Sequence, residues 1–176
     1  MHCLMKTIIV MVAALVLATA VFGQEVSREQ LKGLEYTSQF IQEVLRLYPP
    51  AWTVARNAVA DDEIMGYRIP AGAIVMVSPY FAHRLEEFWP DPLRFDPERF
   101  TPEAIAARHP FAYFPFSLGP RICIGMQFSL YEARLVLAML LRRFEVLSVG
   151  GGEVGARAQG TLRPDTALMV RLTPRQ

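Results

Sequence analysis

The sequence predicts an α+β fold that is mostly helical. Two long segments carry apolar residues at helical spacing, short strand-like runs follow the first of them, and an irregular proline-rich stretch precedes the second. The chain has 176 residues, of which 52% are hydrophobic and 20% are charged. This length fits one ordinary domain and is sufficient to bury a core.

Charge and cysteine content exclude several classes of protein. Lys plus Arg number 18 and Asp plus Glu number 17, so the net charge is +1. A nucleic-acid-binding protein needs a basic face, and this balance argues against one. The two cysteines, Cys3 and Cys123, exclude a disulfide scaffold and a four-cysteine zinc or iron–sulfur site within one chain.

An uncharged, mostly apolar run covers residues 8–22. Small residues at Ala18 and Ala20 give the pattern of a signal cleavage site, and a membrane-spanning helix needs about 20 apolar residues. Residues 1–20 are therefore expected to be a cleaved signal peptide. The alternative is an anchor that associates with a membrane through residues 8–22. Residues 21–33 are expected to be a linker and residues 34–176 the folded domain.

Residues 34–48 are predicted to form the first helix, which Pro49 and Pro50 end. Its apolar stripe consists of Phe40, Ile41, Val44, Leu45 and Tyr48. Strands are predicted at residues 54–59 and 74–77, with turns around Tyr67–Ile69 between them. A short helix is predicted at residues 78–84.

Residues 88–116 are predicted to be an ordered meander without regular elements, because they are dense in Pro, Phe and Arg. So long an irregular stretch usually has a function. Residues 125–143 form the longest helix candidate, with an apolar side of Leu130, Ala133, Leu137, Leu140 and Leu141. Residues 150–152 are three glycines that break the pattern, and residues 161–164 and 167–172 are predicted to be closing strand segments.

The most informative stretch, residues 116–125, fits F-x-x-G-x-R-x-C-x-G at all five fixed positions. These positions are Phe116, Gly119, Arg121, Cys123 and Gly125. A chance match in a chain of this length is on the order of one in ten thousand or rarer. In this motif the chain resembles the cytochrome P450 family, at the loop that supplies the thiolate ligand of haem iron.

The chemistry of that loop explains its residue types. A thiolate rather than a thiol ligates iron, and Cys123 directly precedes a predicted helix N-terminus that favours negative charge. Arg121 adds positive charge nearby. Gly119 and Gly125 allow tight turning and close approach of the backbone to a flat macrocycle, and Phe116 can shield the sulfur from water.

Other interpretations of Cys123 remain. A lone cysteine is usually a small buried hydrophobic residue. A Cys–His hydrolase would need His83 or His109 beside the sulfur, and nothing in the sequence positions either. A zinc site lacks a second cysteine once Cys3 leaves with the leader.

Two further motifs strengthen the resemblance. Glu43 and Arg46 form E-x-x-R on the first helix, and residues 97–100 read P-E-R-F. In the family, the residues matching Glu43, Arg46 and Arg99 form a buried charge triad that locks the meander to the helix. Losing one partner of such a cluster costs several kcal/mol, on the order of 3–5.

The resemblance also assigns haem contacts. Arg56 follows the prolines at the position whose counterpart contacts a haem propionate, and Arg121 makes a second such contact, because arginine pairs well with carboxylates. Alternatively, Arg56 is a surface residue. His83-Arg84 resembles the family's H-R-D, but Leu85 replaces the acid. Glu132-Ala133 and Leu162-Arg163-Pro164 match the helix after the loop and the terminal strand region.

The resemblance implies an oxidoreductase, a haem-thiolate monooxygenase that inserts one atom of O2 into a lipophilic organic substrate. It implies haem b as cofactor and NAD(P)H as electron source through a reductase or ferredoxin. Arg121, Arg142 and Arg143 could receive an acidic redox partner or form a solvated face. Residues 51–54 (Ala51, Trp52, Thr53, Val54) are expected to line the substrate site or to pack in the core.

The likeness runs from Leu34 to Leu172 and covers only the C-terminal part of the family's catalytic domain. It implies the K-helix, a small β-sheet, the meander, the Cys-ligand loop, the L-helix and a closing β-hairpin. The expectation is a truncated chain with impaired turnover. The alternatives are a non-catalytic fragment that binds haem weakly and an exported interaction module. Localisation is open: the leader favours export or membrane association, whereas the chemistry favours a cytoplasmic or cytosol-facing location.

Overall fold

The computed structural model describes residues 33–150 and 154–175. The predicted signal peptide and all but the last residue of the predicted linker lie outside the described residues. Helices are present at α3 (Glu35–Leu47), α4 (Pro79–Ala82), α5 (Pro102–Ala107) and α6 (Met126–Arg143), with 3-10 turns η2 (Pro97–Phe100), η3 (Pro110–Ala112) and η4 (Gly119–Arg121). Strands are present at β1 (Val54–Asn57), β2 (Asp62–Ile64), β3 (Tyr67–Ile69), β4 (Ile74–Val77), β5 (Phe144–Val149), β6 (Ala156–Ala158), β7 (Leu162–Pro164) and β8 (Met169–Pro174).

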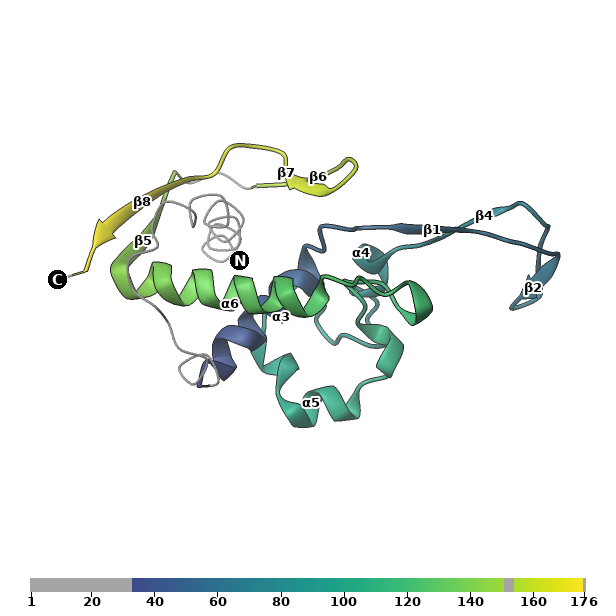
Figure 1. The fold of residues 1–176 in the computed structure, drawn as a ribbon, viewed down its shortest axis with the longest axis horizontal. Helices are drawn as coiled ribbons and strands as arrows, with labels where there is room; N and C mark the ends of the chain where they lie inside the picture. Colours follow the sequence, from purple (N-terminus) through teal and green to yellow (C-terminus); the bar gives the residue numbers. More distant parts are fainter. Residues whose placement is uncertain (1–32, 151–153, 176) are drawn as a thin grey trace.

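The strands form antiparallel pairs, β1–β4, β2–β3, β5–β8 and β6–β7. The β1–β4 pair extends away from the helices as an arm, with β2–β3 toward its tip (Figure 1). Met65 and Gly66 join β2 to β3 with φ angles of 51° and 83°. Two consecutive positive φ angles favour the tight turn that matches the twist of a hairpin.

Helices α3 and α6 lie side by side and bury the two predicted apolar stripes against each other (Figure 1). The buried centre consists of Ile41, Val44 and Leu137, and the half-buried residues around it include Leu130 and Ala133. Leu141, which was expected on the apolar side of α6, is 42% exposed. The core therefore forms over the first two-thirds of α6, where the helix faces α3.

A second buried cluster fills the region between α4 and η3. Trp89, Phe100 and Ala112 form its centre, with Phe88 and Tyr113 packed around it. Because this cluster consists largely of aromatic residues, the region can pack densely with little regular structure.

The expectation that residues 88–116 lack regular elements is wrong. Helix α5 lies within this range, between the 3-10 turns η2 and η3. Thr101 caps α5 by accepting a hydrogen bond from the Ala104 N–H, and Pro102 occupies its first turn. A threonine followed by proline is a known start signal for a helix, so the sequence contained the information.

The C-terminal region differs from the expectation in three respects, the first of which is the unpredicted strand β6. Strand β5, which was not predicted, continues directly from α6 and pairs along its length with β8. Strand β8 begins at Met169 rather than at residue 167 and extends to Pro174. Strand β5 was missed because its apolar residues continue the apolar content of α6.

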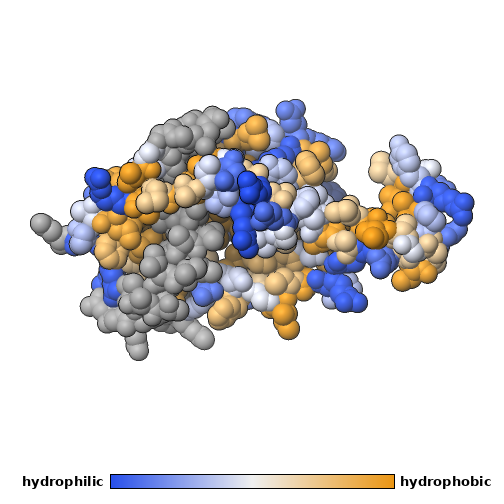
Figure 2. All heavy atoms as spheres, turned by 90° about the horizontal axis from the view of Figure 1, so that it is seen from above, coloured by the Kyte–Doolittle hydropathy of each residue, from blue (hydrophilic) through white to orange (hydrophobic). Residues whose placement is uncertain are grey.

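Many apolar side chains are exposed on the arm, where orange residues cover much of the surface in Figure 2. Ile64, Tyr67, Ile74 and Met76 are all at least 48% exposed. Across residues 33–150 and 154–175, none of the helices combines the length and apolar character that crossing a membrane requires.

Candidate functional site

The loop that contains Cys123 is held in shape by its own backbone. The Cys123 N–H donates to the Phe116 carbonyl at 2.9 Å, and the Ile122 N–H donates to the Gly119 carbonyl at 3.0 Å. The Ser117 N–H donates to the Phe114 carbonyl at 3.1 Å. These bonds fix the position of Cys123 relative to the buried chain that enters the loop.

The two glycines of the motif differ in their backbone conformation. Gly119 has a φ of +70°, in the left-handed region that favours glycine. Gly125 has a φ of −83° at the N-cap of α6, a conformation that any residue adopts. A Cβ atom on Gly125 would lie 3.8 Å from the Cys123 Sγ, in ordinary contact. Position 119 therefore requires glycine because of its backbone conformation. At position 125 the backbone would accept another residue, whose side chain would lie beside the Cys123 sulfur.

Cys123 is exposed and lies just before α6, an 18-residue helix. The Met126 N–H donates to the Cys123 carbonyl at 3.2 Å, so the cysteine forms the last turn before the helix. The sulfur-bearing residue thus lies at the end of the helix where the backbone N–H groups lack carbonyl partners within the helix.

A cavity of about 570 Å³ lies beside Cys123, within the range of small-molecule sites. Phe116, Ser117, Arg121 and Cys123 contribute to its lining from the loop. The remaining walls come from α3, the chain after it, α6 and the β6–β7 region, and include Ile41, Val44, Leu45, Tyr48, Pro50, Leu130, Ala133, Ala156 and Leu162. The site is thus a largely apolar hollow with one thiol and few charged groups.

The two predicted haem-contacting arginines take different positions. Arg121 lines the cavity. Arg56 is exposed on β1 and does not line it, but its Nη2 donates to the Ser117 Oγ at 3.3 Å. Ser117 has a φ of +65° and does line the cavity. The structure therefore brings Arg56 to the edge of the loop rather than into the hollow.

The E-x-x-R pair is completely buried. Arg46 donates to both carboxylate oxygens of Glu43, from Nε at 2.6 Å and from Nη2 at 2.8 Å. Its Nη1 donates at 2.8 Å to the His83 and Pro92 carbonyls. Because the pair is bidentate and its other donors are used, it avoids the penalty of an unsatisfied buried charge.

Arg99 is the looser member of the predicted triad. Its Nε lies 3.7 Å from the Glu43 Oε1, within ion-pair range, and makes no hydrogen bond. Its Nη2 instead donates to the Asp91 carbonyl at 3.0 Å. The Asp96 N–H donates to the same Glu43 oxygen at 2.8 Å. The meander is thus joined to α3 mainly through backbone groups.

His83 is a buried residue whose importance the sequence analysis missed. It is 0% exposed. Its Nε2 accepts from the Phe114 N–H at 2.9 Å and its Nδ1 lies 3.2 Å from the Arg46 carbonyl. Burial, together with the nearby charges of Arg46, Arg84 and Arg108, lowers the pKa of His83 to about 4. The imidazole is therefore neutral at ordinary pH.

Neither histidine offered for a Cys–His hydrolase lines the cavity that Cys123 lines. His83 is occupied by backbone partners, and the exposed His109 accepts from the Phe111 N–H at 3.3 Å. Among the residues that the structure describes, no group of three or more His, Cys, Asp or Glu side chains could hold a metal ion. Neither of these two histidines is therefore placed as a general base for Cys123.

Leu85 occupies the position at which the family's H-R-D motif has an acidic residue. Leu85 is 48% exposed. Arg84 donates to the Leu47 and Tyr80 carbonyls, and its guanidinium lies 3.8 Å from the centre of the Tyr80 ring. The arginine therefore caps the end of α3 without an acidic partner at residue 85.

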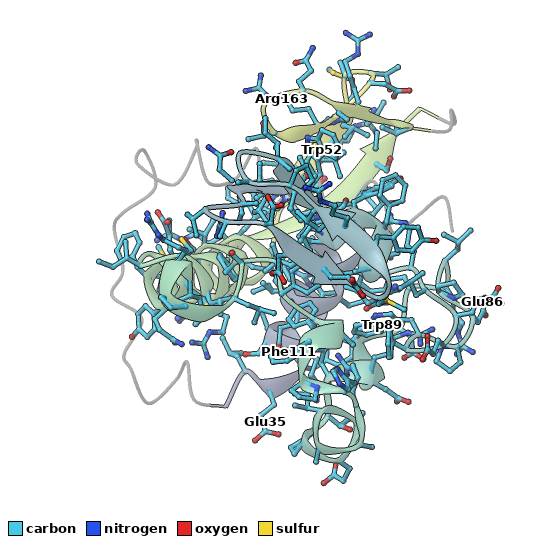
Figure 3. All side chains as sticks on the ribbon, turned by 90° about the vertical axis from the view of Figure 1, so that its right-hand side faces the viewer. Glu35, Trp52, Glu86, Trp89, Phe111 and Arg163 are labelled. Carbon is cyan, nitrogen blue, oxygen red and sulfur yellow. The ribbon has the colours of Figure 1, made fainter. Side chains whose placement is uncertain are left out.

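Of the four residues expected to line the substrate site or to pack in the core, two line the cavity. Ala51 and Val54 line the cavity, whereas Trp52 and Thr53 do not. The Trp52 Nε1 donates to the Gln159 carbonyl at 2.8 Å, which places its ring against the turn after β6, near Arg163 (Figure 3). The Thr53 Oγ1 donates to the Val77 carbonyl at 3.4 Å. These two residues are structural here.

The basic residues expected to receive a redox partner do not form one patch. Arg121 lies before the N-terminus of α6, and Arg142 and Arg143 lie in its last turn. At 1.5 Å per residue, the helix separates the two groups by about 25 Å. The other matched residues, Glu132-Ala133 and Leu162-Arg163-Pro164, all line the cavity.

Known proteins resemble this chain over most of its length. Residues 17–169 match the family model of cytochrome P450. Cytochrome P450 4V2 of Rattus norvegicus is 41% identical over 159 residues, covering 88% of this chain and 30% of the relative. Thromboxane-A synthase of Sus scrofa is 40% identical over 146 residues, covering 82% and 27% respectively. The chain thus spans about 30% of the length of the curated relatives it matches.

Solved structures agree with the fold. The haem domain of cytochrome P450DA superposes with a TM-score of 0.81 and 28% identity, over 97% of this chain and 37% of that one. The retinoic acid-bound cyanobacterial CYP120A1 superposes with a TM-score of 0.80 and 35% identity, over 88% and 36%. The predicted fold class is confirmed, and this chain, with its cysteine loop between a buried E-x-x-R helix and α6, belongs to the cytochrome P450 family.

Proposed function

We propose that Cys123 ligates the iron of haem b, in a monooxygenase-type site that inserts one atom of O2 into a small lipophilic substrate. The observation that carries this proposal is the Cys123 thiol at the wall of a largely apolar cavity, within a loop that matches the family motif at every fixed position. Electrons would come from NAD(P)H through a reductase or ferredoxin, as the family's chemistry requires.

The residues present suit this cofactor. A single soft sulfur donor at one wall would suit haem iron, and Cys123 would hold it. The cavity volume of about 570 Å³ suits a flat organic group. Aliphatic and aromatic residues make up most of the lining, which suits a porphyrin and excludes a hydrated metal ion.

Two arginines are available for the propionates. Arg121 lines the cavity and Arg56 is linked to its edge through Ser117. A guanidinium can donate two parallel hydrogen bonds to a carboxylate, which would fix the orientation of the group in its plane. In this proposal Glu43, Arg46 and Arg99 are structural and hold the meander behind the loop.

In this proposal the protein's own contribution is to hold the sulfur at the wall of the cavity and to limit the access of water. When bound, the haem supplies O2 activation, which a thiolate ligand promotes. Cys123 lies just before the N-terminus of α6, and Arg121 lines the same cavity. Phe116 lines the same cavity and would shield the sulfur from solvent, which tunes its donor strength.

Reconstitution with haem tests the proposal. The full chain with haem, reduced under carbon monoxide, is expected to give the red-shifted Soret band of thiolate ligation. Cys123→Ser should abolish that band, and Cys123→His should replace it with a band at shorter wavelength. Cys3→Ser, at the chain's other cysteine, is the matched control and should leave it unchanged. Loss of the band in Cys3→Ser, or its persistence in Cys123→Ser, would exclude Cys123 as the ligand.

A second candidate is a non-catalytic role in which the chain binds haem weakly or docks onto another protein. The exposure of apolar residues beside the loop favours it, since Ile124 is 104% and Phe128 is 72% exposed. Substrate turnover with a reductase separates the two candidates. A thiolate-type spectrum without turnover supports the second, and turnover supports the first.

A further inference from the structure

We propose that His83 is a positioning residue that fixes the cysteine loop to α3 through the acceptor nitrogen of its ring. The inference rests on the proposed function only in that the loop then holds the iron ligand. It concerns a residue outside the cavity and outside the charge pair already described.

The tautomer of His83 follows from its partners. Nε2 lies 2.9 Å from the Phe114 backbone nitrogen, which carries a hydrogen, so Nε2 must be the acceptor. Nδ1 lies 3.2 Å from the Arg46 carbonyl oxygen, which can only accept, so Nδ1 must carry the proton. The ring is therefore a neutral Nδ1–H imidazole with both nitrogens used.

Through these two bonds His83 spans two segments that are distant in sequence. On one side is the backbone of Arg46 in α3, whose side chain also donates to the His83 carbonyl at 2.8 Å. On the other side is Phe114, two residues before Phe116. The ring also packs against Tyr113 and Phe114, each with a centroid separation of 5.2 Å. His83 thus holds the entrance of the loop against the buried charge pair.

From Phe114 the constraint continues to the cysteine through the backbone. The Phe114 carbonyl accepts from the Ser117 N–H at 3.1 Å, and the Phe116 carbonyl accepts from the Cys123 N–H at 2.9 Å. A shift of Phe114 therefore changes the frame in which Cys123 is held. Because His83 is fully buried, water cannot replace its acceptor nitrogen without an opening of the structure.

Two amide substitutions separate the two nitrogens. In His83→Gln the side-chain oxygen can reach the place of Nε2 and accept from Phe114. In His83→Asn the shorter amide can occupy the place of Nδ1 and donate to Arg46, but it cannot reach Phe114. The pair therefore compares loss of the donor with loss of the acceptor at similar size and polarity.

The test is amide hydrogen exchange at Phe114, Ser117 and Cys123, with the rate of Cys123 alkylation by a maleimide, in the full chain without added haem. His83→Asn should speed exchange at these amides by about tenfold or more, as expected for loss of a buried hydrogen bond, and should change the alkylation rate. His83→Gln should stay within about twofold of the unsubstituted chain. His109→Asn, the same substitution at an exposed histidine whose Nδ1 accepts from the Phe111 N–H, is the control and should have no effect.

Equal exchange in His83→Asn and in the unsubstituted chain would overturn the proposal, and so would equal acceleration in both His83 variants. If neither variant folds, nitrogen NMR of the imidazole in the unsubstituted chain decides: a proton on Nδ1 supports the proposal and a proton on Nε2 overturns it. Since no haem is present, these outcomes are independent of the proposed cofactor. Failure of the haem spectrum would leave a positive exchange result intact.

Discussion

The buried charge cluster and the cysteine loop are connected through Phe114, which is bonded to His83 and to Ser117. The polar side chains of the cluster are buried, whereas those of the loop are accessible. In the cluster, the residues Glu43, Arg46 and His83 are each 0% exposed. At the loop, Arg121 and Cys123 are exposed and face an open hollow. The comparison shows that the polar groups behind the loop are buried and bonded to one another, whereas the proposed iron ligand remains accessible.

The largest effect is expected from breaking the buried cluster. Arg46→Ala leaves the Glu43 carboxylate buried without its bidentate partner, and should lower the free energy of unfolding by about 3–5 kcal/mol. Denaturant unfolding followed by circular dichroism measures this loss.

A matched exposed pair is the control for that experiment. Arg68 and Asp61 lie 2.8 Å apart on the arm, with side chains 78% and 57% exposed. Arg68→Ala should cost no more than about 1 kcal/mol. Equal losses in the two variants would contradict the distinction between the buried support and the exposed surface.

Acid should reveal the same cluster through His83. Above pH 6.5 the imidazole is neutral in the folded and unfolded states. As the pH falls from 6.5 toward 4, the unfolded chain binds a proton that the folded chain does not bind, because burial and the charges of Arg46, Arg84 and Arg108 lower the pKa of His83 to about 4. Folded stability should therefore fall by about 3 kcal/mol across this range.

His83→Gln removes the titrating group and should flatten this part of the stability curve. Asp61, whose pKa is lowered by the Ala71 N–H and by Arg68, loses its stabilising effect at lower pH than this window. Unfolding free energies at pH 7 and pH 4.5 for both proteins give the measurement. Parallel curves for the two proteins would show that His83 does not titrate as described.

The smallest effect is expected in the loop itself. Gly119→Ala places a side chain at a φ of +70° with no atom within 4 Å of the new Cβ, so the cost is conformational and should be about 1 kcal/mol. Gly125→Ala meets no such strain and should cost less than about 0.5 kcal/mol. Thermal unfolding compares the two, and a larger loss for Gly125→Ala would reverse this assignment.

The sequence predicted the elements that have strong local signals. Apolar spacing located α3 and α6, the prolines at 49 and 50 marked the end of α3, and the run Ile74–Val77 coincides with β4. The residues of β2 and β6 are exposed, so no apolar alternation marked them. Their pairing depends on a partner strand, which local patterning does not encode.

The site was predictable where chemistry fixes residue type and less so where contact depends on tertiary packing. The motif placed Phe116, Arg121 and Cys123 in one loop, and the structure puts all three at one cavity. By contrast, the likeness of His83-Arg84 to H-R-D gave no sign of the two backbone partners of His83. Trp52 was expected to line the substrate site or to pack in the core, and it does not line the cavity because its indole N–H is bonded to the Gln159 carbonyl.

The positions of the two tryptophans give the molecule a built-in optical readout. Trp89, which is 1% exposed, lies between the guanidinium groups of Arg46 and Arg108, at 5.0 and 4.1 Å from its ring, so its emission reports on the buried cluster. Trp52 is half-buried beside the hairpin that borders the cavity. A porphyrin in the cavity would quench Trp52 by energy transfer, so a variant that keeps only this tryptophan could follow cofactor capture.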